Sequence, residues 1–315
     1  MKLLHIALIT DQSPQLGLRT ALKRYADEYI EYSWIPKYNA GRIAELRQEV
    51  IELVRTYRPT HIFCQLQTPN IISPDDFREI KRINPCYIIN WTGDVRQPTP
   101  HWYIDTAPAV DITLFTNQAD VDKLKSLGLR ADYLQIGYSP TVFNPDGGKD
   151  HSCPDIVFMG SNYNRRFPLS EQRSEMVAGL KRRYGSNFMI FGHNWGGEVQ
   201  FLAEPSEARI YRSCRIAINQ NHFILPRFSS DRIFRIIGSG AFCASQYYPG
   251  IELEWEPGKH LVTWTTFEEL YSLIDHYLSH DGERRLIASQ GNYHCVTNHT
   301  WECRVKDLFG RIVRI

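Results

Sequence analysis

A chain of 315 residues with 36 Lys and Arg against 35 Asp and Glu carries a formal net charge of +1 at pH 7. This balance argues against a broad electrostatic contact with nucleic acid or an anionic membrane and leaves room only for a local basic patch. The length favours two domains, since single hydrophobic cores stop growing at about 250–300 residues.

The seven cysteines are odd in number and scattered, without CxxC pairs. Several fall in apolar, strand-like runs, so we expect reduced core residues in a cytoplasmic protein. The N-terminus, MKLLHIALITDQ, meets a polar residue too early for a signal peptide and is typical of a first strand. No apolar run reaches the roughly 18 residues that a membrane span needs, so none is expected.

The first half of the chain alternates apolar runs of strand length with amphipathic helical segments. Residues 3–10 form a continuous apolar run, typical of a strand buried on both faces of a parallel sheet. Strands that alternate with helices at this spacing predict a doubly wound parallel sheet. The expected strands are 3–10, 29–35, 61–67, 86–91, 112–116 and 132–136, and the expected helices are 18–25, 42–57, 74–83 and one that ends at 127.

Residues 137–154 are dense in Gly, Pro, Asp and Asn and form the best candidate linker. The alternation restarts after them, which predicts an α/β chain of two Rossmann-like domains, 1–150 and 151–315, that face a cleft. Ligands of such folds bind at the carboxyl ends of the strands. The expected strands here are 155–160, 188–191, 215–219, one after 240, and 261–264, with helices at 170–184, 207–213, 233–237, 267–278, 282–288 and 301–309.

The stretch SSDRIFRIIGSGAFCASQ, residues 229–246, combines a polar start, a short helix, a glycine turn and a buried strand. Ser230 or Asp231 is expected to cap the helix by accepting from its free N–H groups. Arg232 lies at the same helix start, where unpaired N–H groups and the helix dipole favour an anion. An ordinary helix–turn–strand unit fits the pattern equally well.

Two further loops of the second half follow predicted strands and carry polar or basic residues. In FMGSNYNRRFP, Gly160 lets a ligand approach the backbone, and Arg165 and Arg166 are placed to pair with a phosphate. NQNHF supplies Asn219 and Asn221 after the next strand but one. Three such loops in one domain favour an anion site over a set of solvated loops.

Several common motifs are missing. Neither GxGxxG nor GxxxxGK[ST] nor GxSxG occurs, so the main signals for dinucleotide binding, a P-loop and a serine hydrolase are absent. The recurring His294, Cys295, His299 and Cys303 fit a C-terminal helix with one inward face better than a metal site, and no metal site is predicted.

Two acidic residues of the first half follow predicted strands. Asp11 comes after the first strand and Asp94 after the fourth. Each is placed to act as a general base toward an acceptor hydroxyl, and each also fits a helix cap or a turn. His193, in FGHNW, is a loop histidine that could face the cleft.

The C-terminal third resembles the CgeB-like (spore-maturation type) group of GT-B glycosyltransferases. The resemblance rests on DRIFRIIGSGAF, YYPGIELEWEPGKHLVTWTTFEELYSLIDHYLSHDGERRLIASQG and HTWECRV, and more loosely on DVR and YLQIGYSPTVFNP in the first domain. It implies that the second domain binds a nucleotide-diphosphate sugar and the first binds the acceptor. It also implies that no cofactor or metal is bound, because basic groups and helix N-termini neutralise the leaving diphosphate.

Carried over by position, the resemblance implies a donor pocket built from loops of the second domain. Gly160 and Ser161 would lie against the donor, Arg165 or Arg166 near its phosphates, and Ser230, Asp231, Arg232, Ser239 and Gly240 around the pocket.

Two positions depart from the resembled group. Many members have a glutamate, which typically holds the donor ribose, where this chain has Arg235, and some have another where it has Arg227. Both acidic positions are basic here. Three alternatives stay open: donor recognition differs, another group such as one from Asn219–His222 holds the ribose, or the domain has lost transferase activity.

These observations predict a metal-independent glycosyltransferase that uses a nucleotide-sugar donor. The acceptor stays open between a small molecule, a glycan, a protein and a modified nucleobase of phage-type DNA, although the charge balance does not indicate a long duplex. Asp11 or Asp94 would serve as base in an inverting enzyme, whereas a retaining enzyme needs no such base. The alternatives are a GT-B-fold sugar-nucleotide epimerase and a non-catalytic protein that binds sugar nucleotides or has a structural role.

Overall fold

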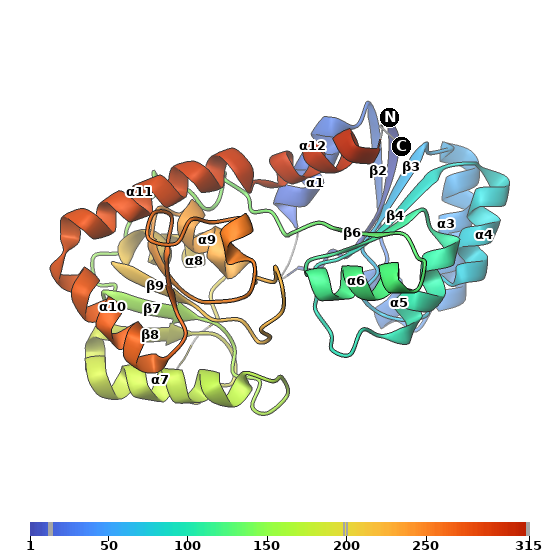
Figure 1. Cartoon of the computed structure of the whole chain (residues 1–315). Coiled ribbons are helices and arrows are strands. Elements are labelled where there is room, and N and C mark those ends of the chain that lie inside the picture. Colours follow the sequence, from blue (N-terminus) through green and yellow to red (C-terminus); the bar gives the residue numbers. More distant parts are fainter. Residues whose placement is uncertain (12–14, 198, 200, 313–315) are drawn as a thin grey trace. The chain divides into compact units, whose positions relative to one another are not determined.

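The computed structural model describes residues 1–11, 15–197, 199 and 201–312 and divides the chain into two units. Unit 1 is Met1–Ile136 together with the residues from Arg304 onward, and unit 2 is Gly137–Cys303. Each unit has one parallel sheet flanked by helices (Figure 1). The predicted pair of Rossmann-like α/β domains is confirmed, and the cleft between them stays a prediction.

This division differs from the expected boundary at 150/151 at both ends of the second domain. Tyr138 and Phe143 already lie in the core of unit 2, with 3% and 2% of their surface exposed. Residues 304–312 return to unit 1, where the ring of Phe309 stacks on Tyr25 with 5.0 Å between the centroids. Both differences come from contacts between residues far apart in sequence, which local composition does not reveal.

The sheet of unit 1 has six parallel strands in the order β2-β1-β3-β4-β5-β6. Parallel strands covered on both faces are expected to be continuous apolar runs, and β1 is buried from its second residue to its last. The strands are β1 (Lys2–Ala7), β2 (Glu28–Ser33), β3 (His61–Cys64), β4 (Tyr87–Thr92), β5 (Ile112–Phe115) and β6 (Ala131–Tyr133), and the helices α1 (Leu16–Tyr25), α2 (Ile35–Asn39), α3 (Ile43–Tyr57), α4 (Pro74–Ile83), α5 (His101–Thr106) and α6 (Gln118–Ser126).

Side-chain caps set the starts of two of these helices. Ser73 and Asp76 form a capping box at α4, with the Asp76 amide donating to Ser73 Oγ at 3.2 Å. Asn117 Oδ1 accepts from the Asp120 amide at 2.9 Å at the start of α6. The sequence-based expectation lacks α2 and α5 because helices of five and six residues are too short to show a hydrophobic period.

The sheet of unit 2 has five parallel strands in the order β11-β10-β9-β7-β8. Helices α7 and α10 pack on one face of this sheet, and α8 and α9 pack on the other (Figure 1). The strands are β7 (Ile156–Met159), β8 (Phe188–Phe191), β9 (Ile216–Asn219), β10 (Phe242–Gln246) and β11 (Val262–Trp264), and the helices α7 (Ser170–Tyr184), α8 (Glu204–Ser213), α9 (Arg232–Gly238), α10 (Phe267–Ser279) and α11 (Asp281–Asn298). The last helix, α12 (Trp301–Ile312), begins in unit 2 and continues into unit 1.

Helix α11 continues well beyond its expected end at 288. Gly291 allows the helix to pass close to the backbone of His260, because a Cβ at this position would lie only 2.2 Å from the His260 carbonyl oxygen. Cys295, one turn later, is fully buried against the Phe234 carbonyl. Because polar residues lie between these two positions, the hydrophobic periodicity of the sequence does not predict that the helix continues here.

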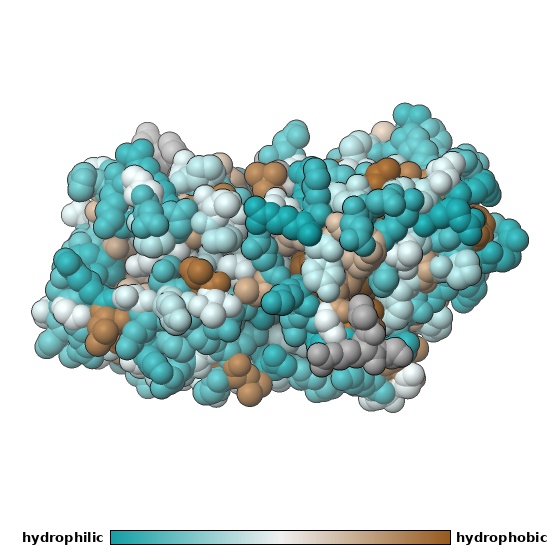
Figure 2. Space-filling view, turned by 90° about the horizontal axis from the view of Figure 1, so that it is seen from above, coloured by the Kyte–Doolittle hydropathy of each residue, from teal (hydrophilic) through white to brown (hydrophobic). Residues whose placement is uncertain are grey.

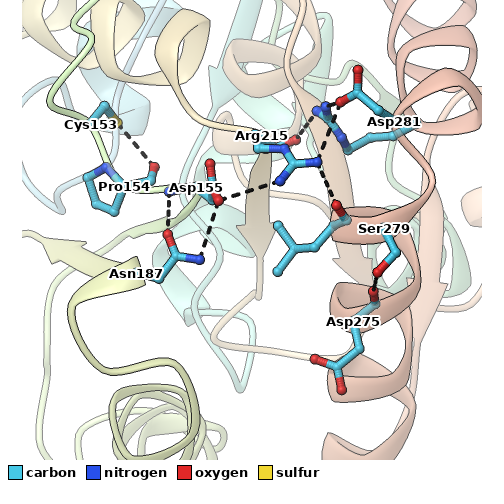
Figure 3. Close-up of polar contacts among 10 residues, drawn as sticks. Cys153, Pro154, Asp155, Asn187, Arg215, Asp275, Ser279 and Asp281 are labelled. Carbon is cyan, nitrogen blue, oxygen red and sulfur yellow. Dashed lines mark hydrogen bonds and ion pairs between the residues drawn. The ribbon is translucent and has the colours of Figure 1, made fainter.

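A polar network centred on Arg215 joins the amino ends of the unit 2 strands to the α10–α11 junction (Figure 3). The Arg215 guanidinium donates to the Leu278 carbonyl at 2.6 Å and lies 3.5 Å from Asp155 Oδ2 and from Asp281 Oδ1. Asn187, directly before β8, completes the network by accepting from the Asp155 amide at 3.1 Å. The carboxyl ends of these strands lie at the opposite edge.

Hydrophobic residues on the face shown in Figure 2 lie scattered among hydrophilic ones. Across the described ranges, no helix combines the length and the apolar character that a membrane crossing demands.

Candidate functional site

The site is built where two neighbouring strands of unit 2 end. β7 ends at Met159 and β9 at Asn219, and the two strands pair directly. Because they are parallel, the loops that follow them meet at one edge of the sheet. This brings Gly160 and Ser161 next to Gln220 and the residues after it.

Gly160 is held by neighbours on both sides. Its amide donates to the Phe191 carbonyl at 2.8 Å, and its carbonyl accepts from Trp195 Nε1 at 2.6 Å. A Cβ at this position would lie 2.9 Å from the Phe158 ring and 3.0 Å from Nη2 of Arg232. Only glycine therefore leaves the space between the backbone and that guanidinium open.

Arg232 ties the ends of β7 and β9 together. Its Nε donates to the Met159 carbonyl, and its Nη1 donates to the Gln220 carbonyl at 3.0 Å. The same Nη1 contacts Asn219 Oδ1 at 3.2 Å and Ser230 Oγ at 3.1 Å. These contacts fix the guanidinium so that Nη2 is directed toward Gly160.

Asn219, Asn221 and Ser230 form the framework behind Arg232. Asn219 is fully buried and accepts from the Ser230 hydroxyl at 3.3 Å. The Asn221 side chain donates to the Phe228 carbonyl at 3.0 Å and accepts from the Ser230 amide at 3.0 Å, which closes the loop on itself. Their polar groups thus position the loop and its arginine.

The expected cap of α9 is wrong. Asp231 stands at the N-cap but its side chain caps no N–H, because its carboxylate lies 2.8 Å from Nη2 of Arg235. The Ser230 hydroxyl is occupied by Asn219 and Arg232. With only seven residues, α9 is also too short for a strong dipole, so the positive charge here comes from side chains.

Arg173, on the first turns of α7, belongs to the same edge and was not among the residues expected from the sequence. Only 1% of it is exposed. Its Nη1 donates to the Ser161 carbonyl at 3.2 Å, and its Nη2 donates to the Gln220 carbonyl at 2.6 Å. Helical spacing could have revealed that Arg173 is buried. Met176, Val177 and Leu180 follow it by three, four and seven residues, so it lies on the apolar face of the helix.

His222 lies beside Arg173 as a neutral acceptor. Burial, followed by the charges of Arg173 and Arg232, lowers the pKa of His222 to about 2. Its Nε2 is 2.6 Å from Nη1 of Arg173, so the ring proton resides on Nδ1, since Nε2 must accept. The rings of Tyr163 and Phe167 pack around it, each 4.8 Å away between centroids.

Arg165 and Arg166 lie on the exposed loop after β7. Arg165 Nε is 2.6 Å from a carboxylate oxygen of Glu171, and both side chains are largely exposed. The Arg166 guanidinium lies 5.5 Å from the Phe167 ring centroid. Both arginines thus flank the buried cluster from outside.

Ser239 and Gly240 are not brought to this edge. In the pairing of β9 with β10, Ser245 lies opposite Asn219, and Phe242 lies opposite Ile216 at the amino end. The turn just before Phe242 is therefore at the other edge of the sheet. There Gly240 adopts a φ of 77°, and a Cβ would meet Pro145 at 2.9 Å, so its role is to turn the chain.

The two basic residues at the usually acidic positions face other parts of unit 2. Arg235 is paired with Glu207 at 2.7 Å and Glu204 at 3.2 Å, both on α8. Arg227 donates its amide to the Pro249 carbonyl at 2.8 Å, and its guanidinium lies 3.9 Å from Glu254. Arg235 therefore joins α9 to α8, and its charge is neutralised there.

In unit 1, Asp11 and Asp94 follow β1 and β4, which lie on either side of β3. Asp11 is exposed and directly precedes residues outside the described ranges. The Asp94 carboxylate is 59% exposed and accepts from the Gln67 amide at 2.9 Å in the amide orientation that satisfies both groups. Both carboxylates are thus accessible at the carboxyl edge of this sheet.

Among the described residues, no group of three or more His, Cys, Asp or Glu is arranged to hold a metal ion. The spaced residues of the C-terminal part have other partners. Nε2 of His294 and Nε2 of His299 lie 2.8 and 3.3 Å from the Glu254 carbonyl oxygen.

Residues 166–310 match a family model described as glycosyl transferase-like, a range that includes Arg173 and Arg232. HepE from Anabaena in complex with UDP-glucose is similar at 11% sequence identity, with 100% of each chain covered and a TM-score of 0.67. Sucrose-phosphate synthase from Thermosynechococcus elongatus is similar at 11% identity, with 99% of this chain and 98% of that chain covered and a TM-score of 0.64. A glycosyltransferase from Rickettsia africae is similar at 12% identity, with 98% of this chain and 97% of that chain covered and a TM-score of 0.63.

The chain has the GT-B fold. At such low identities the solved structures establish the architecture of this GT-B chain, and the match to the glycosyl transferase-like model covers its C-terminal part, a little under half of the chain. No curated protein matches the sequence significantly.

Proposed function

We propose that this GT-B chain is a glycosyltransferase of the CgeB-like group that moves a sugar from a nucleotide-diphosphate donor to a hydroxyl-bearing acceptor. The observation that carries the proposal is the Arg232 guanidinium, fixed on the ends of β7 and β9 with Nη2 directed at Gly160. A guanidinium held beside a glycine can donate charge-assisted hydrogen bonds to a phosphate oxygen, because no side chain at the glycine blocks its approach. The structure of HepE with UDP-glucose supports a donor of the UDP-sugar type.

In this proposal the donor diphosphate lies along Gly160 and Ser161 and is contacted by Arg232. Negative charge grows on the leaving diphosphate as the glycosidic bond breaks, and a guanidinium already in place stabilises it without reorganisation. Asn219 and Ser230 hold that guanidinium and Asn221 holds the Ser230 backbone, while Arg165 and Arg166 attract the donor from outside. Ser239 and Gly240 have no part in the site. No bound metal or cofactor is proposed.

Unit 1 is proposed to bind the acceptor at the carboxyl edge of its sheet. If the reaction inverts the sugar, Asp11 or Asp94 accepts the proton of the attacking hydroxyl. Both follow strand ends and are accessible. The proposal specifies the acceptor only as a molecule that bears a hydroxyl group.

The decisive experiment is a thermal-shift panel of nucleotide sugars, followed by detection of released nucleoside diphosphate. A donor that binds only the folded protein raises its melting temperature by mass action, and at a hundred times Kd it adds about 2.7 kcal/mol of stability. We expect UDP-glucose or a related UDP-sugar to give this rise. Arg232→Ala is expected to abolish it, whereas Arg183→Ala, on the exposed side of α7, should retain it.

Three outcomes would contradict the proposal. The donor site is rejected if no nucleotide sugar at millimolar concentration raises the melting temperature. Transfer is rejected if a sugar nucleotide binds and no acceptor ever leads to release of nucleoside diphosphate. Formation of a new sugar nucleotide without that release would establish an epimerase instead.

A further inference from the structure

Two guanidinium groups from different elements meet at one carbonyl oxygen. The carbonyl of Gln220 accepts from Nη2 of Arg173 at 2.6 Å and from Nη1 of Arg232 at 3.0 Å. Both guanidinium groups also lie over the ring of Phe158, with Cζ 5.3 and 5.2 Å from its centroid. Two full positive charges are thus separated by little more than a carbonyl oxygen and an aromatic ring.

Among the described residues, the hydrogen-bond partners of this pair are neutral groups. Arg173 contacts the Ser161 carbonyl, the Gln220 side chain and the neutral His222, and Arg232 contacts carbonyls, an amide and a hydroxyl. Throughout the part of the chain that the structure describes, neither arginine forms an ion pair with a carboxylate. The nearby acids are already engaged: Glu171 pairs with Arg165, and Glu207 and Asp231 pair with Arg235.

An arrangement of this kind is unfavourable on its own. A buried charge is normally paired with an opposite charge, because burial removes its hydration, and two like charges at short range repel each other. Burial and the neighbouring Arg232 both lower the pKa of Arg173 well below its ordinary value. An anion at the site would relieve the desolvation and the repulsion together.

Arg173 itself cannot be the group that touches this anion. Its three guanidinium nitrogens are taken by Ser161, Gln220 and His222, and it is almost fully buried. It draws the Ser161 and Gln220 carbonyl oxygens, which would repel an anion, toward the protein interior. Its effect reaches the ligand through its charge and through the direction of these two peptide groups.

We propose that Arg173 is a positioning residue of the donor site: a buried second cation behind Arg232 whose charge stays uncompensated until a diphosphate binds at Gly160. The proposal rests on the proposed function for the identity of the diphosphate group. It further assigns the site a preference for a multiply charged anion over a singly charged one, since two adjacent cations must be compensated.

The test uses the full chain and inorganic pyrophosphate, which carries the charge of the diphosphate without sugar or base. At constant ionic strength, pyrophosphate should raise the melting temperature of the wild type well above the effect of chloride. Arg173→Gln should weaken pyrophosphate binding on the order of tenfold. Arg173→Lys, which keeps the charge, should retain most of the affinity, and Arg183→Gln on the exposed side of the same helix should leave it unchanged.

A purely structural Arg173 predicts another pattern. Arg173→Gln would then melt at a lower temperature but show the full pyrophosphate shift and the same salt dependence of binding, which would overturn the proposal. If Arg173→Gln does not fold, the wild type still decides: a pyrophosphate shift no larger than that of chloride at equal ionic strength refutes the charge pair. If pyrophosphate binds as expected but no nucleotide sugar does, the proposed transferase function fails and the charge pair stands.

Discussion

At the scale of single residues, the site depends on how closely the backbone of Gly160 approaches two side chains. The Phe158 ring and Nη2 of Arg232 would both contact a Cβ at this position. Phe158 sits in the packed core of the sheet and is fully buried, so it cannot move away cheaply. The guanidinium is the group that would have to shift.

We expect Gly160→Ala to weaken nucleotide-sugar binding about tenfold, since a displaced Arg232 loses a charge-assisted hydrogen bond of roughly 1.5–3 kcal/mol. Donor titrations followed by intrinsic fluorescence would measure the change. Gly148→Ala is the matched control, because no atom lies within 4 Å of its Cβ position. Unchanged affinity in Gly160→Ala would show that the space beside Arg232 is not used by the donor.

At the scale of elements, α9 is attached to α8 by one arginine. Arg235 contacts Glu207 and Glu204 of α8 as well as Asp231 before its own helix, and its guanidinium lies 5.1 Å from the Phe143 ring centroid. Burial raises the pKa of Glu207 against the opposing effect of Arg235. Glu207 is buried, whereas a quarter of the Arg235 side chain is exposed, so the carboxylate depends on the arginine for its partner.

Arg235→Met is expected to destabilise the protein by about 3–5 kcal/mol, because Glu207 would remain buried without its partner. Urea unfolding would measure the loss, and adding Glu207→Leu should recover much of it. Arg285→Ala is the control: Arg285 is 77% exposed in its pair with Asp281, and such pairs contribute about 1 kcal/mol or less. A loss as small as that of the control would mean that the α8–α9 contact does not depend on Arg235.

At the scale of the whole molecule, the chain crosses between its two units twice. The second crossing lies within α12, whose first residues belong to unit 2 and whose later ones belong to unit 1. In unit 1, Phe309 is fully buried against Tyr25 and His61, and Arg311 pairs with Asp132. The later part of α12 thus belongs to the core of the first unit.

Phe309→Ala is expected to cost about 3–5 kcal/mol, the usual range for emptying a buried aromatic site. Hydrogen exchange would show faster exchange in β1 and β3 than in the strands of unit 2. Tyr293→Ala, on α11 and 76% exposed, should leave exchange unchanged in both units. Equal acceleration in the two units would contradict the assignment of Phe309 to the core of unit 1.

Much of the architecture could be predicted from hydrophobic periodicity. All six strands of unit 1 and all five of unit 2 lie at or within a few residues of their expected positions. The location of Gly160, Ser161, Asn219 and Arg232 at one edge also follows from strand order alone, since parallel strands place their carboxyl ends together. Ser239 and Gly240 could have been assigned to the opposite edge by the same geometry, because a helix after a strand returns the chain to the amino edge.

The sequence by itself determined two doubly wound sheets and the loops that meet at the carboxyl edge of each, because these depend on local patterns and on the rules of parallel sheets. Only the tertiary structure decided which charges are paired. Arg235 is neutralised by acids of α8, whereas Arg173 and Arg232 meet on Gln220 with no carboxylate partner among the described residues. The direction of a side chain depends on packing between distant segments. That direction decides whether an arginine pairs with a carboxylate of the protein or is left to bind an anion.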